Sequence, residues 1–109
     1  MSSNRIPPEV REEVDKIVQH FNEEWIEDPG DHYLTRYRGR FLYLDRLTPG
    51  GPGSICRLEY TGNMHQWGFA IYKYSDERYD PDEWFFPGEE HVNGTIEGAL
   101  KAGMEAYPF

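Results

Sequence analysis

The sequence has a single cysteine and no long apolar run, and each of these absences excludes a class of protein. Cys56 has no partner for an internal disulfide, so we expect no disulfide-stabilised secreted scaffold. No stretch approaches the roughly 18 apolar residues that a membrane-spanning helix needs, and residues 1–8 lack the pattern of a signal peptide. We therefore expect a soluble cytoplasmic protein that does not enter a membrane.

The four most common large apolar residues are also scarce. Leu, Ile, Val and Phe make up 22 of 109 residues, near the level of about 20% at which a highly charged chain can stay disordered. The 17 aromatic residues argue for a fold, because each can bury on the order of 150–250 Å². A chain of 109 residues has the length typical of a domain with a single hydrophobic core. We predict a single domain over residues 1–109, with an aromatic-rich core and a flexible N-terminus at residues 1–7.

Basic residues number 11 against 20 acidic ones, which gives a net charge of −9. This balance argues against nonspecific binding to nucleic acid or to an anionic membrane. The charge is unevenly distributed, since residues 1–31 carry −6, residues 32–74 carry +4 and residues 75–109 carry −7. An anionic ligand or partner would therefore bind at the basic middle segment.

Two segments have the periodicity of amphipathic helices. Residues 8–27 predict the first helix, in which Pro8 suits the first turn and Pro29-Gly30 ends the pattern. Its apolar face consists of Val10, Val14, Ile17, Val18, Phe21 and Trp25. A second helix follows Asn93 or Thr95 as N-cap. Its apolar face consists of Ile96, Ala99, Leu100, Gly103, Met104 and Tyr107.

The middle of the chain predicts two hairpins. Residues 32–47 contain two short strands, with a turn at Arg38-Gly39-Arg40 where Gly39 can adopt a positive φ. Residues 54–61 and 65–74 alternate apolar and polar side chains and form the second hairpin. The sheet is therefore expected to be antiparallel.

Two segments between these elements predict irregular structure. Residues 48–53 contain five Pro or Gly residues out of six, which predicts a loop. Residues 75–94 are acidic, and their order is left open by the sequence. Within them, Trp84-Phe85-Phe86 forms either a short strand or an apolar plug under a loop.

The element order predicts an α+β fold with an N-terminal helix, an antiparallel sheet of three to five strands and a C-terminal helix, both helices lying on one face of the sheet. This order is similar in outline to a double-stranded-RNA-binding domain. The closing helix, however, has Lys101 as its one basic residue, where such a domain presents a cluster of Lys and Arg to phosphates. We therefore expect no binding of double-stranded nucleic acid.

The sheet face away from the helices is the candidate binding surface. Leu42 and Leu44 point to one side of their strand while Phe41 and Tyr43 point to the other, so either face keeps apolar surface. Tyr and Arg are enriched at the energetic centres of protein interfaces. The candidate binding residues are Arg36, Tyr37, Arg38, Arg40, Phe41, Tyr43 and Arg57.

These residues predict a non-enzymatic protein-interaction module whose partner is another protein or a second copy of the chain, as in a homodimer. A first alternative is a binder of single-stranded nucleic acid or a small anion through the Arg36–Arg40 hairpin, because guanidinium groups bind phosphate and aromatic rings stack on bases. A second alternative is a small hydrolase-like enzyme in which Cys56 pairs with His65, or in which Ser54 or Ser75 replaces the thiol. No signature assigns a catalytic residue, and we expect no cofactor.

The acidic segment does not match a known metal loop. Asp80-Pro81-Asp82 resembles the opening of a calcium loop, but Trp84 and Phe85 occupy positions where that loop needs an oxygen ligand and Gly. Glu89, Glu90 and His91 offer further ligand types in the same segment. We interpret the segment as a solvated acidic loop and expect no metal site.

Overall fold

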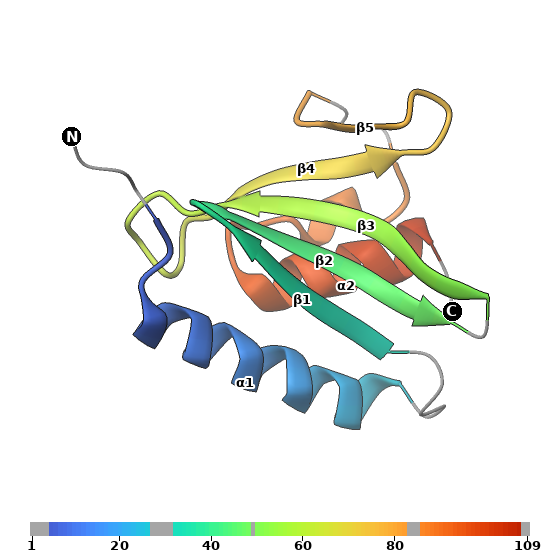
Figure 1. The fold of residues 1–109 in the computed structure, drawn as a ribbon. Helices are drawn as coiled ribbons and strands as arrows, with labels where there is room; N and C mark the ends of the chain where they lie inside the picture. The colour runs from blue at the N-terminus through green and yellow to red at the C-terminus, as the bar shows by residue number, and fades with distance from the viewer. Residues whose placement is uncertain (1–4, 27–31, 49, 83–85, 108–109) are drawn as a thin grey trace.

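The computed structural model describes residues 5–26, 32–48, 50–82 and 86–107 (Figure 1). The elements, in chain order, are α1 (Pro8–Trp25), β1 (His32–Arg38), β2 (Phe41–Thr48), β3 (Gly51–Glu59), β4 (Gly68–Lys73), β5 (Arg78–Asp80), the short 3-10 helix η1 (Glu89–His91) and α2 (Ile96–Ala106). Each strand pairs antiparallel with the next, in the order β1-β2-β3-β4-β5. The predicted α+β fold is confirmed, with five strands.

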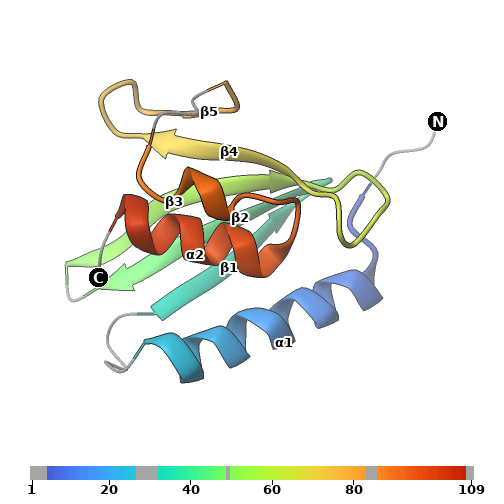
Figure 2. The ribbon, with the colours of Figure 1, turned by 180° about the vertical axis from the view of Figure 1, so that it is seen from behind.

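Both helices pack on the same face of the sheet, as predicted. The Tyr33 hydroxyl donates a hydrogen bond to the Leu100 carbonyl of α2 at 2.7 Å, and the Thr35 hydroxyl donates to Asp15 of α1 at 2.9 Å. Because residues two apart in a strand share a face, α1 and α2 lie on one side. Figure 2 shows this side, with α2 in front of the sheet and α1 along β1.

Helix α1 nearly matches the predicted limits of 8 and 27. Pro8 lies in the first turn, where a missing N–H breaks no helical hydrogen bond. The stripe residues Val14, Val18 and Phe21 are buried, whereas Trp25 stacks on Phe21 and stays 51% exposed. Residues 27–31 lie outside the described part of the chain. Neither α1 nor α2 is long and apolar enough to span a bilayer.

The segment before α1 packs on the turn between β1 and β2. Ile6 is only 1% exposed, and its N–H donates to the Gly39 carbonyl at 3.2 Å. Ile6 therefore belongs to the core, although it lies in the predicted flexible segment 1–7, of which residues 1–4 are outside the description. Gly39 has a φ of +61°, the conformation expected of it.

The predicted loop over residues 48–53 was wrong for most of its length. Gly51, Pro52 and Gly53 belong to β3 and pair with Thr48, Leu47 and Arg46 of β2. A proline is tolerated here because β3 pairs with β4 only from Cys56 onward, so Pro52 has no second neighbouring strand that needs its N–H. In this segment, Pro and Gly residues therefore mark a stretch of strand that is paired on one side only, as well as a turn.

The second predicted hairpin is present, with a longer connection between its two arms than predicted. Strand β3 ends at Glu59 and β4 begins at Gly68, inside the predicted limits of 61 and 65. Trp67 leaves the ladder because its N–H donates to the Gly94 carbonyl and its indole N–H donates to the Met64 carbonyl, both at 2.8 Å. The bond to Gly94 connects the hairpin loop to the segment just before α2, and the bond to Met64 closes the loop on itself.

Residues 75–94, whose order the sequence left open, contain β5 and η1. Tyr79 of β5 pairs with Tyr72 of β4. Phe86 stacks on the core residue Phe69, with ring centroids 5.8 Å apart. The other two residues of the predicted apolar knot, 84 and 85, lie outside the described residues.

Helix α2 begins after Thr95, whose side chain accepts a hydrogen bond from the Gly98 N–H at 3.0 Å. Of the two predicted N-cap candidates, Asn93 and Thr95, Thr95 is therefore the N-cap. Gly103 permits the predicted close approach to the sheet, since an added Cβ would lie 2.5 Å from the Tyr33 hydroxyl and 2.7 Å from Ile55 Cγ2. The contact of Tyr33 with α2 therefore requires a residue without a side chain at 103.

We predict that Gly103→Ala lowers the free energy of unfolding. Alanine favours a helix by about 1 kcal/mol over glycine, but overpacking a buried contact of this closeness costs up to about 3 kcal/mol. Urea unfolding measures the difference. In a Tyr33→Phe background the cost of Gly103→Ala should be smaller, because the clashing hydroxyl is gone. A stabilising Gly103→Ala substitution would contradict the close packing.

Candidate functional site

The sheet face opposite the helices carries a cluster of arginine and aromatic side chains, which we call the open face. By strand register, Arg36, Tyr43 and Arg57 form one cross-strand row on it. Neither α1 nor α2 lies on this face, which is turned toward the viewer in Figure 1 while α2 lies behind the sheet. The residues of the open face include Arg36, Arg38, Phe41, Tyr43, Asp45, Arg57, Glu59, Tyr72 and Tyr79, together with Leu34 opposite Asp45 and Ala70 opposite Arg57.

Arg57 is held between two aromatic rings. Its guanidinium carbon lies 4.5 Å from the ring centroid of Phe41 and 5.4 Å from that of Tyr79. Such stacking orients a guanidinium group without neutralising its charge. Within the described ranges no carboxylate lies within ion-pair distance of Arg57. The positive charge of Arg57 is therefore positioned but not compensated by a described side chain.

Arg36 is positioned and also paired. It stacks on Tyr43 at 4.4 Å, and its Nε donates to Asp45 Oδ2 at 3.1 Å. The hydrogen bond to Asp45 raises the pKa of Arg36. The second oxygen of Asp45 is buried without a partner among the described residues. Arg36 therefore compensates a partly buried carboxylate and has a structural role.

The remaining hairpin arginines lie at the end of the open face. Arg40, in the turn, forms an ion pair with Glu59 at 3.0 Å and lies 5.5 Å from the Phe41 ring. Arg38 is exposed and, by register, points to the same side as Phe41. With these two, six of the seven predicted binding residues lie on or beside the open face.

Tyr37 is the predicted residue that the structure places elsewhere. It lies on the helix side, where its hydroxyl donates to Asp15 Oδ1 of α1 at 2.6 Å. Burial raises the pKa of Tyr37 above its ordinary range, with a further contribution from Asp15. The physical reason is strand alternation: Arg36 and Arg38 point outward, so Tyr37 between them points inward. Tyr37 joins the sheet to α1.

Sequence reasoning missed Tyr72 and Tyr79. Tyr79 lies against Tyr43 at 5.4 Å and against Tyr72 at 4.9 Å, both in edge contacts. Residues 78–80 alternate polar and aromatic side chains, which is the pattern of a strand. Three residues in an acidic segment are, however, too few to distinguish a strand from a turn. Tyr79 extends the open face to β5, so that it spans all five strands of the sheet.

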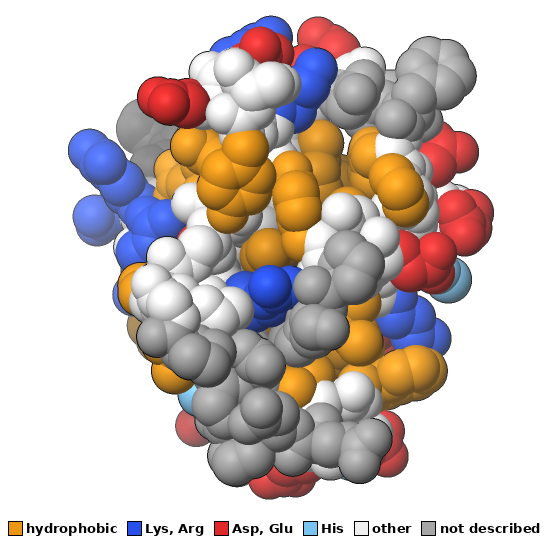
Figure 3. Space-filling view, turned by 90° about the vertical axis from the view of Figure 1, so that its right-hand side faces the viewer, with side chains coloured by type: hydrophobic (Ala, Val, Ile, Leu, Met, Phe, Trp, Pro, Cys, Tyr) orange, Lys and Arg blue, Asp and Glu red, His pale blue; other side chains and the backbone are white. Residues whose placement is uncertain are grey.

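Edge contacts continue from the open face to the end of α2. Tyr74 lies 4.8 Å from Tyr72 and 5.4 Å from Tyr107, and its hydroxyl donates to the Ser54 carbonyl at 2.7 Å. Figure 3 shows hydrophobic side chains gathered on this side of the molecule, next to residues that are not described. A cavity of about 290 Å³ adjoins Tyr74 and Arg46, whose Nη1 donates to the Tyr107 carbonyl at 2.6 Å. These bonds give the tyrosines a structural role.

The catalytic alternative has little geometric support. Cys56 is fully buried in the middle of β3, and burial raises the pKa of its thiol far above its ordinary range. His65 is exposed in the loop between β3 and β4, and no hydrogen bond joins a histidine to Cys56 within the described chain. A protonated, inaccessible thiol is a poor nucleophile.

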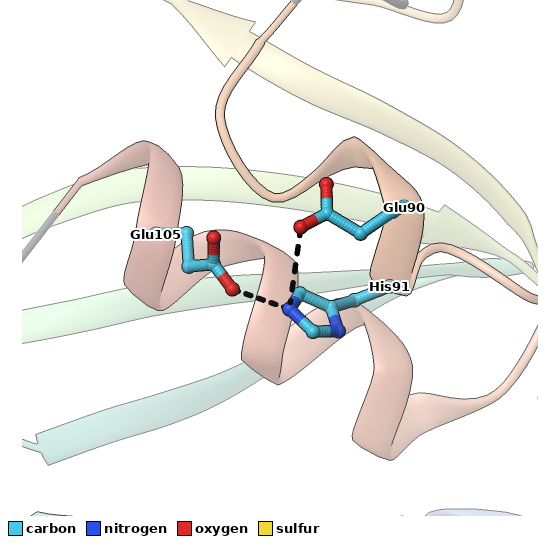
Figure 4. A group of neighbouring side chains, drawn as sticks. All are labelled: Glu90, His91 and Glu105. Carbon is cyan, nitrogen blue, oxygen red and sulfur yellow. Dashed lines mark hydrogen bonds and ion pairs between the residues drawn. The ribbon is translucent and has the colours of Figure 1, made fainter.

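A second cluster of polar side chains lies on the helix side, where η1 meets α2 (Figure 4). His91 Nε2 contacts Glu105 Oε2 and lies 3.8 Å from Glu90 Oε2. The side chains of His91, Glu90 and Glu105 are 33%, 65% and 48% exposed. The sequence shows Glu90 and His91 as neighbours, but only the packing of η1 on α2 brings Glu105 to them.

Comparison with protein-family models, with curated proteins and with solved structures gives no significant match. The function must therefore be argued from these two clusters and from their chemistry.

We predict that Cys56 resists alkylation in the native protein. Iodoacetamide reacts with the thiolate, and the burial that raises the pKa of Cys56 also blocks access. Mass spectrometry after treatment at pH 8 should show unmodified native protein and complete labelling in guanidinium chloride. Rapid labelling of the native protein would show that the thiol is accessible and would revive the catalytic alternative.

Proposed function

We propose that this protein is a non-enzymatic interaction module whose open face binds an acidic segment of a partner protein that also carries apolar side chains. The observation that carries the proposal is Arg57, stacked between Phe41 and Tyr79 without a described carboxylate partner. A partner carboxylate can form a bidentate pair with such an oriented guanidinium group. Apolar side chains of the partner would then cover the rings of the open face.

Charge complementarity supports an acidic partner. Four arginines and two carboxylates, Asp45 and Glu59, lie on or beside the open face, which leaves it positive in a protein of net charge −9. The positive charge is therefore local, and the acidic remainder would repel an acidic partner from other surfaces. Such a distribution orients an encounter and selects against wrong partners.

The same stacking argues for a protein partner over single-stranded nucleic acid. Base recognition on a sheet needs free aromatic ring faces. Here the Arg57 guanidinium occupies a face of Phe41 and the Arg36 guanidinium occupies a face of Tyr43. Less ring surface is left for bases, while the guanidinium edges remain available to carboxylates.

The test is an amide NMR titration of the whole chain with a short capped peptide of alternating Glu and Phe. We expect resonances of residues 36–43 and of Arg57 to shift. Arg57→Gln should weaken binding about tenfold, the equivalent of about 1.4 kcal/mol. Arg57→Lys should give an intermediate loss, because it keeps the charge but not the planar stacking group.

Two matched controls keep the test specific. A Lys and Phe peptide of the same length should not bind, and Arg78→Gln, which makes the same charge change beside Asp80, should bind like the wild type. Arg36 is not a suitable test position because its loss would leave Asp45 unpaired. Equal binding of both peptides, or unchanged binding by Arg57→Gln, would refute the proposal. Salt-sensitive shifts with oligo(dT) alone would favour the nucleic-acid alternative.

A further inference from the structure

We propose that Glu90, His91 and Glu105 form a binding site for a divalent transition metal ion, with Zn²⁺ as the preferred ion. The imidazole nitrogen of His91 and one carboxylate oxygen of each glutamate all lie within 4.8 Å of one another. Figure 4 shows both carboxylates directed at the same ring nitrogen. The ligands come from two consecutive elements, η1 and α2.

After small movements of the two carboxylates, the three ligand atoms can surround a tetrahedrally coordinated ion. Zinc binds His nitrogen and carboxylate oxygen at about 2.0–2.2 Å, which places two ligand atoms roughly 3.3 Å apart. The separation from His91 Nε2 to Glu90 Oε2 is 3.8 Å, and Glu105 Oε2 is closer than this ideal. Since both glutamates are about half exposed or more, their carboxylates can shift without disturbing the core.

The backbone that carries the ligands is closely packed. A Cβ added at Gly88 would lie 2.7 Å from the Ala102 carbonyl oxygen and 2.8 Å from Glu105 Cβ. A Cβ at Gly98 would lie 2.3 Å from the His91 carbonyl oxygen. These glycines let η1 lie directly on α2, so the positions of His91 and Glu105 are set relative to each other before an ion binds.

The donor set selects among metals. One nitrogen and two carboxylate oxygens match Zn²⁺. Calcium needs six to eight oxygen ligands, and magnesium is seldom held by imidazole, so neither fits this group. With a neutral imidazole the cluster carries two negative charges, which a divalent cation balances.

A cavity adjoins the site and leaves room for the remaining coordination position. It has a volume of about 240 Å³ and is lined by Trp25, His91, Lys101, Met104 and Glu105. Water can occupy the fourth position of a zinc ion held by three protein ligands. The Lys101 ammonium lies over the Trp25 ring at 5.3 Å and forms no ion pair with a glutamate within the described residues.

The test is isothermal titration of the EDTA-treated, dialysed protein with ZnCl₂ in a non-chelating buffer. We expect one ion per chain, and a thermal unfolding midpoint that rises with zinc because the ion binds only the folded arrangement. His91→Ala and Glu105→Gln should each weaken binding tenfold or more, since even residues that merely support ligands contribute this much. Affinity should fall at acid pH, because a ligating imidazole must be unprotonated.

The chain offers a matched control on α1. His20 and Glu24 form an exposed pair at 3.3 Å that has no third ligand group beside it among the described residues. His20→Ala should therefore bind zinc like the wild type. Absence of stoichiometric binding, or zinc binding that His91→Ala leaves unchanged, would overturn the proposal. Circular dichroism of each variant shows whether a loss of binding reflects a loss of folding.

Discussion

Strand alternation combined with a core on only one side of the sheet is the constraint on which the rest of this structure depends. Along β1, Tyr33 and Tyr37 point to the helices, where their hydroxyls bond to α2 and α1, while Arg36 points away. Leu42 and Leu44 of β2 are buried on the helix side, and burying each of them contributes about 1.5–3 kcal/mol. The other face carries arginines and aromatic rings, together with the carboxylates of Asp45 and Glu59.

On the open face, the arginines and rings stabilise one another without full charge neutralisation. Arg36 is committed to Asp45, whose second oxygen is buried, and so serves the fold. Arg57 has ring contacts alone among the described residues, and so keeps its hydrogen-bonding capacity for another molecule. The difference between these two neighbours in one cross-strand row separates a structural arginine from a candidate binding arginine.

On the helix side, small residues set the distances between elements. Gly103 lets α2 approach Tyr33, and Gly88 and Gly98 let η1 lie against α2. The same close packing that completes the core therefore brings His91 to Glu105. The two candidate sites lie on opposite sides of the sheet and depend on different contacts, so either can be lost without the other.

Local sequence signals determined much of the fold. Periodicity placed both helices, Gly39 marked the first turn and Thr95 capped α2, because each of these features depends on residues within a few positions. The side of the sheet on which Tyr37 lies and the close contact between His91 and Glu105 were decided only by the tertiary structure. Strand register and helix packing depend on contacts between distant residues, and one step of register moves a side chain to the opposite face.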